Sequence, residues 1–210
     1  MPNITGPALS IPTSAFPGTT SSGSPTGIVG EANFSQLVGR YATLVKSGKV
    51  FYTSAIITAP VIFSTAAQLG PMIWNRPGSG VDAHILAVGV SSPTVATTVA
   101  GAISYASNTQ ATVPTTATAL TVMNAYAGGG TSAMGGVYST ATILVAPTNV
   151  PFPLIACNTG AITTGVLTTN YFDVGGMFQV GPGNIGYICA NATLTAGVFT
   201  IGLLWAELPA

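Results

Sequence analysis

From Val50 onward, short apolar runs alternate with breaks built from Gly, Pro and Asn, and this punctuation limits the folds open to the chain. The runs VFYTSAIIT, residues 50–58, and HILAVGV, residues 84–90, are rich in β-branched residues. Such residues favour strands, whereas Gly and Pro interrupt them. Many short strands separated by turns are typical of an antiparallel β-sandwich or jelly roll. We therefore expect residues 49–210 to form a mainly β domain of this class.

The second half of this region carries the clearest strand patterns. VYSTATILV, residues 137–145, follows several Gly breaks, and PFPLIAC, residues 151–157, contains prolines that indicate an edge strand. The turn GPGN, residues 181–184, joins MFQV to IGYICA. Alternation in the last run predicts one shared face for four large apolar residues: Phe199, Ile201, Leu203 and Trp205. Residues 94–127 are less regular, and we expect one strand near 99–107 followed by a long loop.

Residues 1–33 differ from the rest, because Pro, Ser, Thr and Gly dominate them. Prolines recur every five residues and favour extended backbone over helix: Pro2, Pro7, Pro12 and Pro17. Such a segment buries too little of itself to offset the entropy lost on ordering. We therefore expect an N-terminal arm that other chains hold in place, with a reach of roughly 90–100 Å when extended.

Residues 34–48 predict one short helix that links the arm to the β domain. Six apolar residues fall on one helical stripe: Phe34, Leu37, Val38, Tyr41, Leu44 and Val45. Asn33 suits the N-cap of this helix, and Gly48 suits its C-terminal stop.

Three of the four basic residues of the chain fall in the segment GRYATLVKSGKVFYTS, residues 39–54. Cations near the end of a helix offset its dipole, which gives Lys46 and Lys49 a local role. The alternative is that these cations meet carboxylates on a neighbouring subunit, because the chain itself offers few. On this second interpretation, an assembly interface would combine arm residues with the cations: Leu9, Ile11, Phe16, Arg40, Lys46 and Lys49.

Charged residues make up only 4% of the sequence, against about 25% in an ordinary soluble domain. The surface must therefore consist of uncharged polar residues or be covered by another molecule. Four basic residues are too few for a nucleic-acid partner. The longest apolar run, residues 196–206, is shorter than a membrane span of about 18 residues, and no signal peptide is visible. We expect neither nucleic acid nor membrane as a partner.

The ionisable residues give little sign of catalysis. No two of the four carboxylates are close enough in sequence to suggest a glycosidase. Asp82 and His84 form the only suggestive base-and-orienter pair. Leu86, Val88 and Val90 are expected to continue the same strand face, which favours a structural histidine. The turn NRPGSG, residues 75–80, lacks the ending of a phosphate-binding loop. We expect no enzymatic activity and no cofactor.

The remaining candidate sites are also weak. One His and two distant Cys do not provide the ligand spacing of a metal site. Cys157 and Cys189 lie in apolar runs, as two buried thiols or as one disulfide. The glycosylation patterns at Asn3, Asn33 and Asn191 are expected by chance in a chain rich in Ser and Thr.

Three segments together resemble a class of small virion proteins of tailed bacteriophages: GRYATLVKSGKVFYTS, NRPGSG, and VGPGNIGYICA followed by GLLWAELP. The resemblance covers residues 39–90 and 174–209. It implies a structural protein of the virion, assembled in the host cytoplasm. Similar jelly-roll proteins of phage heads are trimeric cement or decoration subunits with extended arms.

Two functional hypotheses follow. The first is a capsid cement or decoration subunit, a homotrimer that clamps the major capsid protein or other virion proteins through its arm and β domain. The second is a fibre or spike module that binds host glycans through aromatic side chains such as Trp74 and Trp205. Burial of these aromatic residues in the core is the other interpretation of their positions.

Overall fold

The computed structural model describes residues 41–58, 60–94, 99–146, 151–159, 168–191 and 198–210. The predicted arm, with its candidate contacts Leu9, Ile11 and Phe16, lies outside the described residues, as does Arg40. By its internal contacts, the chain divides into two compact units, Met1–Ser47 and Gly48–Ala210.

The described part of the first unit is one turn of helix. Helix α3, Ala42–Lys46, is closed by hydrogen bonds from the Val45 N–H to the Tyr41 carbonyl at 2.9 Å and from the Ser47 N–H to the Thr43 carbonyl at 3.0 Å. Lys46 occupies its last turn, as predicted. The predicted helix began at residue 34, and its positions 34–40 lie outside the described residues.

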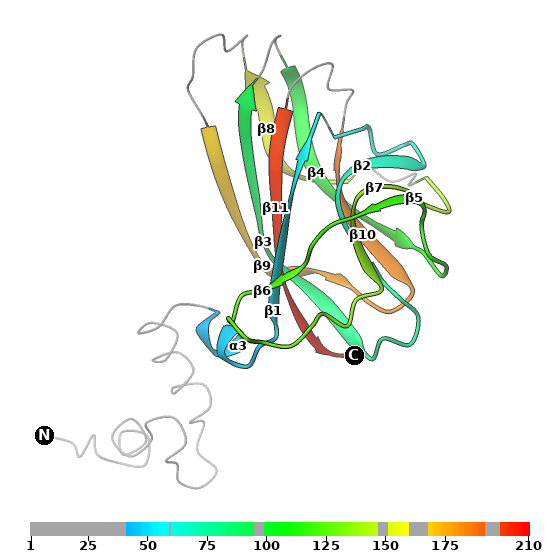
Figure 1. Ribbon diagram of the computed structural model, residues 1–210. Helices are drawn as coiled ribbons and strands as arrows, with labels where there is room; N and C mark the ends of the chain where they lie inside the picture. The colour runs from blue at the N-terminus through cyan, green and yellow to red at the C-terminus, as the bar shows by residue number, and fades with distance from the viewer. Residues whose placement is uncertain (1–40, 59, 95–98, 147–150, 160–167, 192–197) are drawn as a thin grey trace, which may run out of the picture. The chain divides into compact units, whose positions relative to one another are not determined.

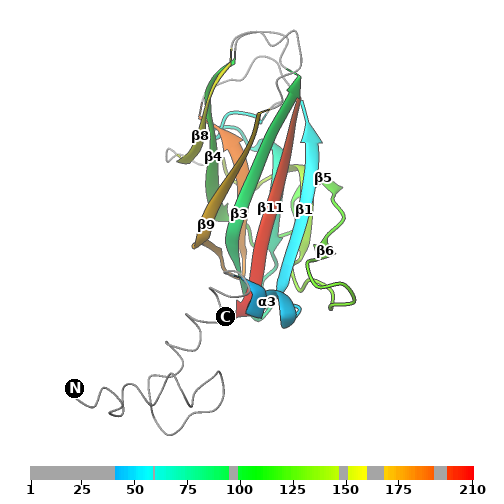
Figure 2. The same ribbon diagram turned by 90° about the vertical axis from the view of Figure 1, so that its left-hand side faces the viewer.

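The second unit is built from two antiparallel sheets (Figures 1 and 2). The first, which we call sheet A, has five strands in the order β6 (Met123–Asn124), β1 (Val50–Ile57), β11 (Val198–Pro209), β3 (Val81–Thr94) and β9 (Thr168–Val180). The second, sheet B, has six in the order β5 (Thr115–Ala119), β7 (Gly136–Thr142), β2 (Ala67–Asn75), β10 (Asn184–Ala190), β4 (Val99–Thr109) and β8 (Phe152–Thr159). The predicted antiparallel β-sandwich is confirmed.

The main core lies between the two sheets. The final strand, β11, buries Phe199, Ile201, Leu203 and Trp205 while the residues between them stay partly exposed, so the predicted alternation is confirmed. Trp205 stacks on Phe51 of β1, with ring centroids 6.1 Å apart. Sheet B contributes mainly aliphatic residues to this core, among them Ile73, Ile103 and Ile188. Burial of these interleaved apolar faces is the main force that holds two sheets together.

A bulge changes which face of β3 its residues occupy. Ile85 points into the core and so does Val88, because the pairing with β9 shifts register between Ile85 and Ala87. The expected single face that would carry His84 together with Val88 is therefore wrong. Of the three residues expected to share a face with His84, only Leu86 does so. This face is the outer face of sheet A.

Sheet B is buried on its outer face as well. A second core cluster lies there: Met72, Trp74, Ala106, Tyr138, Ala141, Ile143, Ile185, Tyr187 and Cys189. The chain after β1 contributes to its cover, because Phe63 packs against this cluster while its N–H bonds to the Ala190 carbonyl at 3.0 Å. Sheet B is thus a buried layer between the main core and a cover made by its own chain.

Several strand limits differ from the sequence prediction. PFPLIAC forms the edge strand β8, as predicted. The strand predicted to reach residue 145 ends at Thr142, because the Leu144 N–H donates to the side-chain oxygen of Gln110 at 2.8 Å instead of to a neighbouring strand. Strand β2 was not predicted.

Candidate functional site

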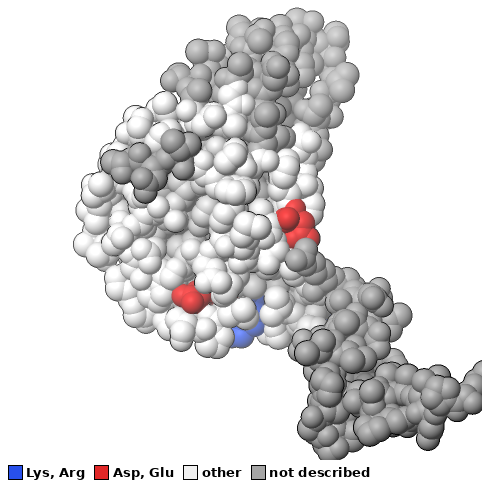
Figure 3. Space-filling model, turned by 180° about the vertical axis from the view of Figure 1, so that it is seen from behind, with Lys and Arg blue, Asp and Glu red and all other residues white. Residues whose placement is uncertain are grey.

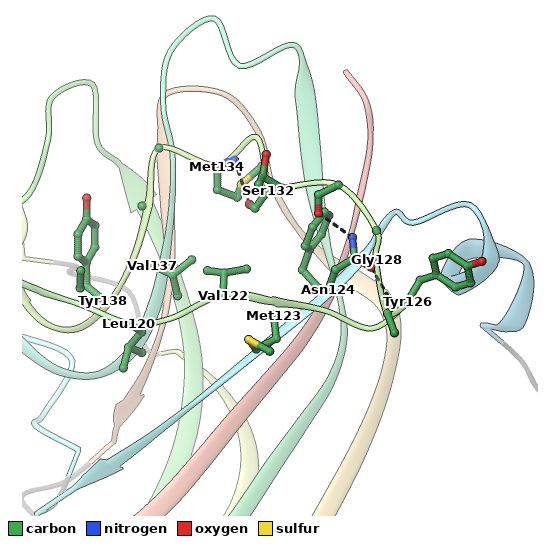
Figure 4. Close-up of a pocket in the computed structure, with 18 residues that line it drawn as sticks. Leu120, Val122, Met123, Asn124, Tyr126, Gly128, Ser132, Met134, Val137 and Tyr138 are labelled. Carbon is green, nitrogen blue, oxygen red and sulfur yellow. Dashed lines mark hydrogen bonds between the residues drawn. The ribbon is translucent and has the colours of Figure 1, made fainter.

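A hollow in the described part of the chain lies beneath residues 119–138, which run from the end of β5 through β6 into β7. These residues, with Phe51 of β1, enclose a pocket of about 680 Å³. Figure 4 shows Tyr138 at one end of the pocket and Tyr126 at the other, with Val122 and Val137 between them. A volume of this size is within the range of small-molecule and side-chain binding sites.

The floor of the pocket belongs to the main core. Phe51 and Val137 are each only 3% exposed, and Leu120, Val122 and Met134 pack against the same core cluster. Met123 and Tyr126 also line the pocket but are each 49% exposed. The pocket therefore leads from an accessible apolar rim to the apolar interior of the sandwich.

Asn124 fastens the chain around the pocket. Its side-chain nitrogen donates to the carbonyls of Gly48 and Gly130, both at 2.9 Å, and its side-chain oxygen accepts the Tyr126 N–H at 2.8 Å (Figure 4). Gly129 has to be a glycine for this arrangement, because a Cβ there would lie 2.5 Å from the Asn124 side chain. With three partners inside the protein, the Asn124 amide has little capacity left for a ligand.

Glu207 fastens the other end of the same segment. Its carboxylate, on β11, is 4% exposed and accepts hydrogen bonds from the Ser132 hydroxyl, from the Ala133 N–H at 2.7 Å and from the Trp205 indole N–H at 3.2 Å. Three donors offset the cost of burying a charge. The Ser132 hydroxyl also accepts the Met134 N–H at 3.2 Å, so it is held by the protein on both sides.

This arrangement suits an uncharged, apolar guest better than a reaction. No charged side chain is among the residues that line the pocket. The polar side chains of Asn124 and Ser132 are used to shape the segment. In the described ranges there is no cluster of three or more His, Cys, Asp or Glu residues that could hold a metal ion.

The predicted assembly residues are only partly described. Lys46 ends helix α3 and Lys49 directly precedes β1, and both side chains are exposed. Arg40, Leu9, Ile11 and Phe16 fall outside the described residues, so the shared interface stays a prediction.

The two tryptophans proposed for sugar stacking are both core residues. Trp74 is 6% exposed and donates its indole N–H to the Gln110 carbonyl at 2.8 Å, and Trp205 is fully buried. Neither ring offers a face to a ligand. The large aromatic side chains that are exposed among the described residues lie elsewhere: Tyr52, Tyr126, Phe152 and Tyr171.

The other candidates have structural roles. The turn NRPGSG connects β2 to β3, and the buried amide of Asn75 in it donates to the carbonyls of Val81 at 2.7 Å and Val180 at 2.8 Å. Asn191 uses its side-chain oxygen to accept the Ala102 N–H at 2.6 Å. Asp82 and His84 lie half-buried on β3, outside the main core.

Cys189 is a buried free thiol, and burial raises its pKa to about 12. This agrees with the buried-thiol interpretation for Cys189, while the side chain of Cys157 lies outside the described residues.

No protein-family model, curated protein or solved structure matches this chain. In the described ranges, no helix has both the length and the apolar character needed to cross a bilayer.

The pocket was not foreseen from the sequence. Gly128–Gly130 and Gly135–Gly136 were recognised only as breaks between strands. The sequence offered one signal of this segment's attachment: Glu207, a carboxylate two residues after Trp205 in an otherwise apolar strand. A buried charge of this kind needs donors from another part of the chain.

Proposed function

We propose that this chain is a structural protein of a bacteriophage virion, a cement or decoration subunit that binds neighbouring virion proteins. The observation that carries the proposal is the outer face of sheet A. This face exposes large apolar side chains, whereas the corresponding face of sheet B is covered by its own chain. Extensive exposed apolar patches mark interaction sites in soluble proteins.

The outer face of sheet A is broad and has a low centre. Across it, Ser54, Gly202, Gly89 and Tyr171 are paired in one row from β1 to β9. A Cβ added to Gly89 would meet no atom within 4 Å, and one added to Gly202 would meet only the Thr53 carbonyl at 3.6 Å, so the centre of the face is low. Large apolar side chains stand around this centre, with their exposed fractions: Tyr52 44%, Ile56 74%, Tyr171 63% and Met177 69%.

Charge is scarce on the surface as well as in the sequence. Figure 3 shows charged side chains only as small separate patches among the described atoms of the face it displays. Interfaces that are permanent tend to be apolar and depleted of charge at their centre. A surface with so little charge is suited to permanent contact with another subunit.

The proposal also gives a role to the N-terminal arm and names the partners of the chain. An N-terminal arm adds contacts on further neighbours, and several weak attachments together hold firmly. We assign the partners as two further copies of the chain in a homotrimer, together with the major capsid protein or other virion proteins. The resemblance of residues 39–90 and 174–209 to small phage virion proteins supports the same assignment.

The first test is a charge placed on the exposed face. Ile56→Lys should disrupt self-association, because the new ammonium group would have to lose its water inside the interface. Sedimentation velocity of the full chain measures the change. Val113→Lys is the matched control, since Val113 is 58% exposed and precedes β5 in sheet B. Self-association that survives Ile56→Lys unchanged would contradict the proposed interface.

The second test concerns the particle itself. Mass spectrometry of purified particles of the phage that encodes the chain should find it at a fixed copy number relative to the major capsid protein. Its absence from the particles would overturn the proposal. Binding to a glycan array by a protein that does not self-associate would favour the fibre or spike alternative.

A further inference from the structure

We propose that the pocket beneath residues 119–138 binds an apolar side chain from the N-terminal segment of a neighbouring copy, with Phe16 as the anchor. The inference rests on the proposed function in one respect, that copies of the chain are neighbours in an assembly. It adds a defined site and a defined occupant, which the proposed function does not specify.

The chemistry of the pocket selects an uncharged apolar guest. Its floor consists of Phe51, Val122 and Val137, and its side-chain amide, Asn124, and the Ser132 hydroxyl are already bonded within the protein. A charged or strongly polar guest would lose its hydration there without gaining partners. Met123 and Met134 both line the pocket, and their flexible thioethers adapt well to an aromatic ring.

The N-terminal segment supplies a guest of this kind. Residues 1–30 contain no Asp, Glu, Lys, Arg or His, so no ionic side chain has to be brought near the pocket. Phe16 is the one aromatic residue in that stretch, and Leu9 and Ile11 precede it. A pocket of about 680 Å³ has room for a phenyl ring together with part of its flanking chain.

The position of Gly48 links the segment to the pocket. The Gly48 carbonyl accepts a hydrogen bond from Asn124, and a Cβ at Gly48 would lie 3.8 Å from the Gly129 Cα. The backbone that leads to the N-terminus therefore leaves the β domain at the rim of the pocket. In a closed ring of copies, each such departure point repeats beside the next subunit.

The length and stiffness of the segment favour the pocket of a neighbour. Seventeen residues, 17–33, lead from Phe16 to the predicted helix over 34–48, a reach of roughly 55–60 Å when they are extended. A domain of this size has a radius of gyration of only about 15 Å. The proline spacing predicts an extended segment, which carries Phe16 beyond its own domain.

Photocrosslinking of the full chain tests the inference directly. Phe16 is replaced by p-benzoylphenylalanine, whose excited ketone inserts into nearby C–H bonds and favours methionine side chains. Nitrogen-14 and nitrogen-15 copies are mixed, irradiated and digested. We expect crosslinks between the two isotopes that join position 16 to the peptide containing Met123 or Met134. The same photoreactive residue at Thr20, in the polar part of the segment, is the control and should give little product there.

A pocket variant provides an independent measurement on the folded protein. Tyr126→Glu places a carboxylate at the accessible rim, keeps both methionines, and should lower the crosslink yield about tenfold, which corresponds to about 1.4 kcal/mol. Val113→Glu adds the same charge just before β5, where Val113 is 58% exposed, and should leave the yield unchanged.

The outcomes separate the two proposals. An oligomer in which position 16 crosslinks outside residues 119–138, or only within its own chain, overturns this inference and leaves the proposed function standing. A monomer that gives no crosslinks between isotopes and is absent from phage particles overturns both. Crosslinks to the pocket that persist at full yield in Tyr126→Glu also count against the inference.

Discussion

The two open sides of the sandwich are closed in different ways. Figure 2 shows β8 and β9 on one side and β5 and β6 on the other. On the β8–β9 side, Phe178 stacks on Tyr105 with ring centroids 4.4 Å apart and meets Phe152 edge-on at 5.2 Å. On the β5–β6 side, a glycine-rich segment crosses between the sheets and leaves the pocket. Side chains seal one side, while backbone spans the other and leaves room for a guest.

This difference separates stability from recognition. A stack of three aromatic rings buries much apolar area and has preferred geometries, so it contributes directly to the free energy of unfolding. The pocket segment buries less of itself and depends on two polar anchors, Asn124 and Glu207. We expect substitutions on the sealed side to change stability most, and substitutions on the pocket side to act mainly on the local segment.

The largest effect is expected for Phe178→Ala. Removing the central ring of the stack should lower the free energy of unfolding by about 3 kcal/mol, because the remaining rings cannot close the gap. Urea denaturation measures this change. Met177→Ala, at the exposed neighbouring position, is the control and should cost less than about 0.5 kcal/mol. Equal losses in the two variants would show that the aromatic stack is not what seals this side.

A smaller, local effect is expected for Gly129→Ala. The new methyl group would displace the Asn124 side chain and should cost about 1–3 kcal/mol. The Tyr126 N–H donates to the side-chain oxygen of Asn124, so hydrogen exchange at this amide should become faster. At Gly130 a Cβ would meet nothing within 4 Å, so Gly130→Ala should change stability by less than about 0.5 kcal/mol. Similar behaviour of the two variants would contradict the anchoring role of Asn124.

The smallest effect is expected for Tyr105→Phe on the sealed side. The Tyr105 hydroxyl is buried without a hydrogen-bond partner among the described residues, so its removal should be neutral or slightly stabilising at pH 7.

The same substitution should change the alkaline pH dependence. Burial raises the pKa of Tyr105 above its ordinary value of 10.0. The unfolded chain then loses this proton first, so stability is complete below pH 10 and falls as the pH rises further. Tyr105→Phe should make that fall shallower in urea titrations. Part of the slope should remain, because burial also raises the pKa of Tyr187 and Cys189. An unchanged slope would contradict the assignment to Tyr105.

The strands that could be predicted are those whose pattern is complete within a few residues. β11 alternates over its whole buried length, and the turn GPGN marks the start of β10. β2 was missed because Gly70 and Pro71 look like a break in sequence. In the structure, a register shift between Leu69 and Met72 absorbs the pair, and a Cβ at Gly70 would come within 2.6 Å of the Ile188 carbonyl.

The pocket could not be predicted because its parts meet only in three dimensions. Asn124 bonds to Gly48, and Glu207 bonds to Ser132 and Ala133. These contacts join positions about 75 residues apart. The same holds for the face of His84, which was misjudged because the bulge depends on the pairing of β3 with β9.

The place of β11 in sheet A has a consequence for synthesis on the ribosome. β11 lies between β1 and β3 and pairs with both, yet about 140 residues separate it from β1. At about 5–20 residues per second, translation of that stretch takes roughly 10–30 s. During this interval Val50–Ile57 has emerged without β11, so one edge of this largely apolar strand lacks its partner. We therefore expect a nascent chain of this protein to bind chaperones that recognise short extended apolar segments.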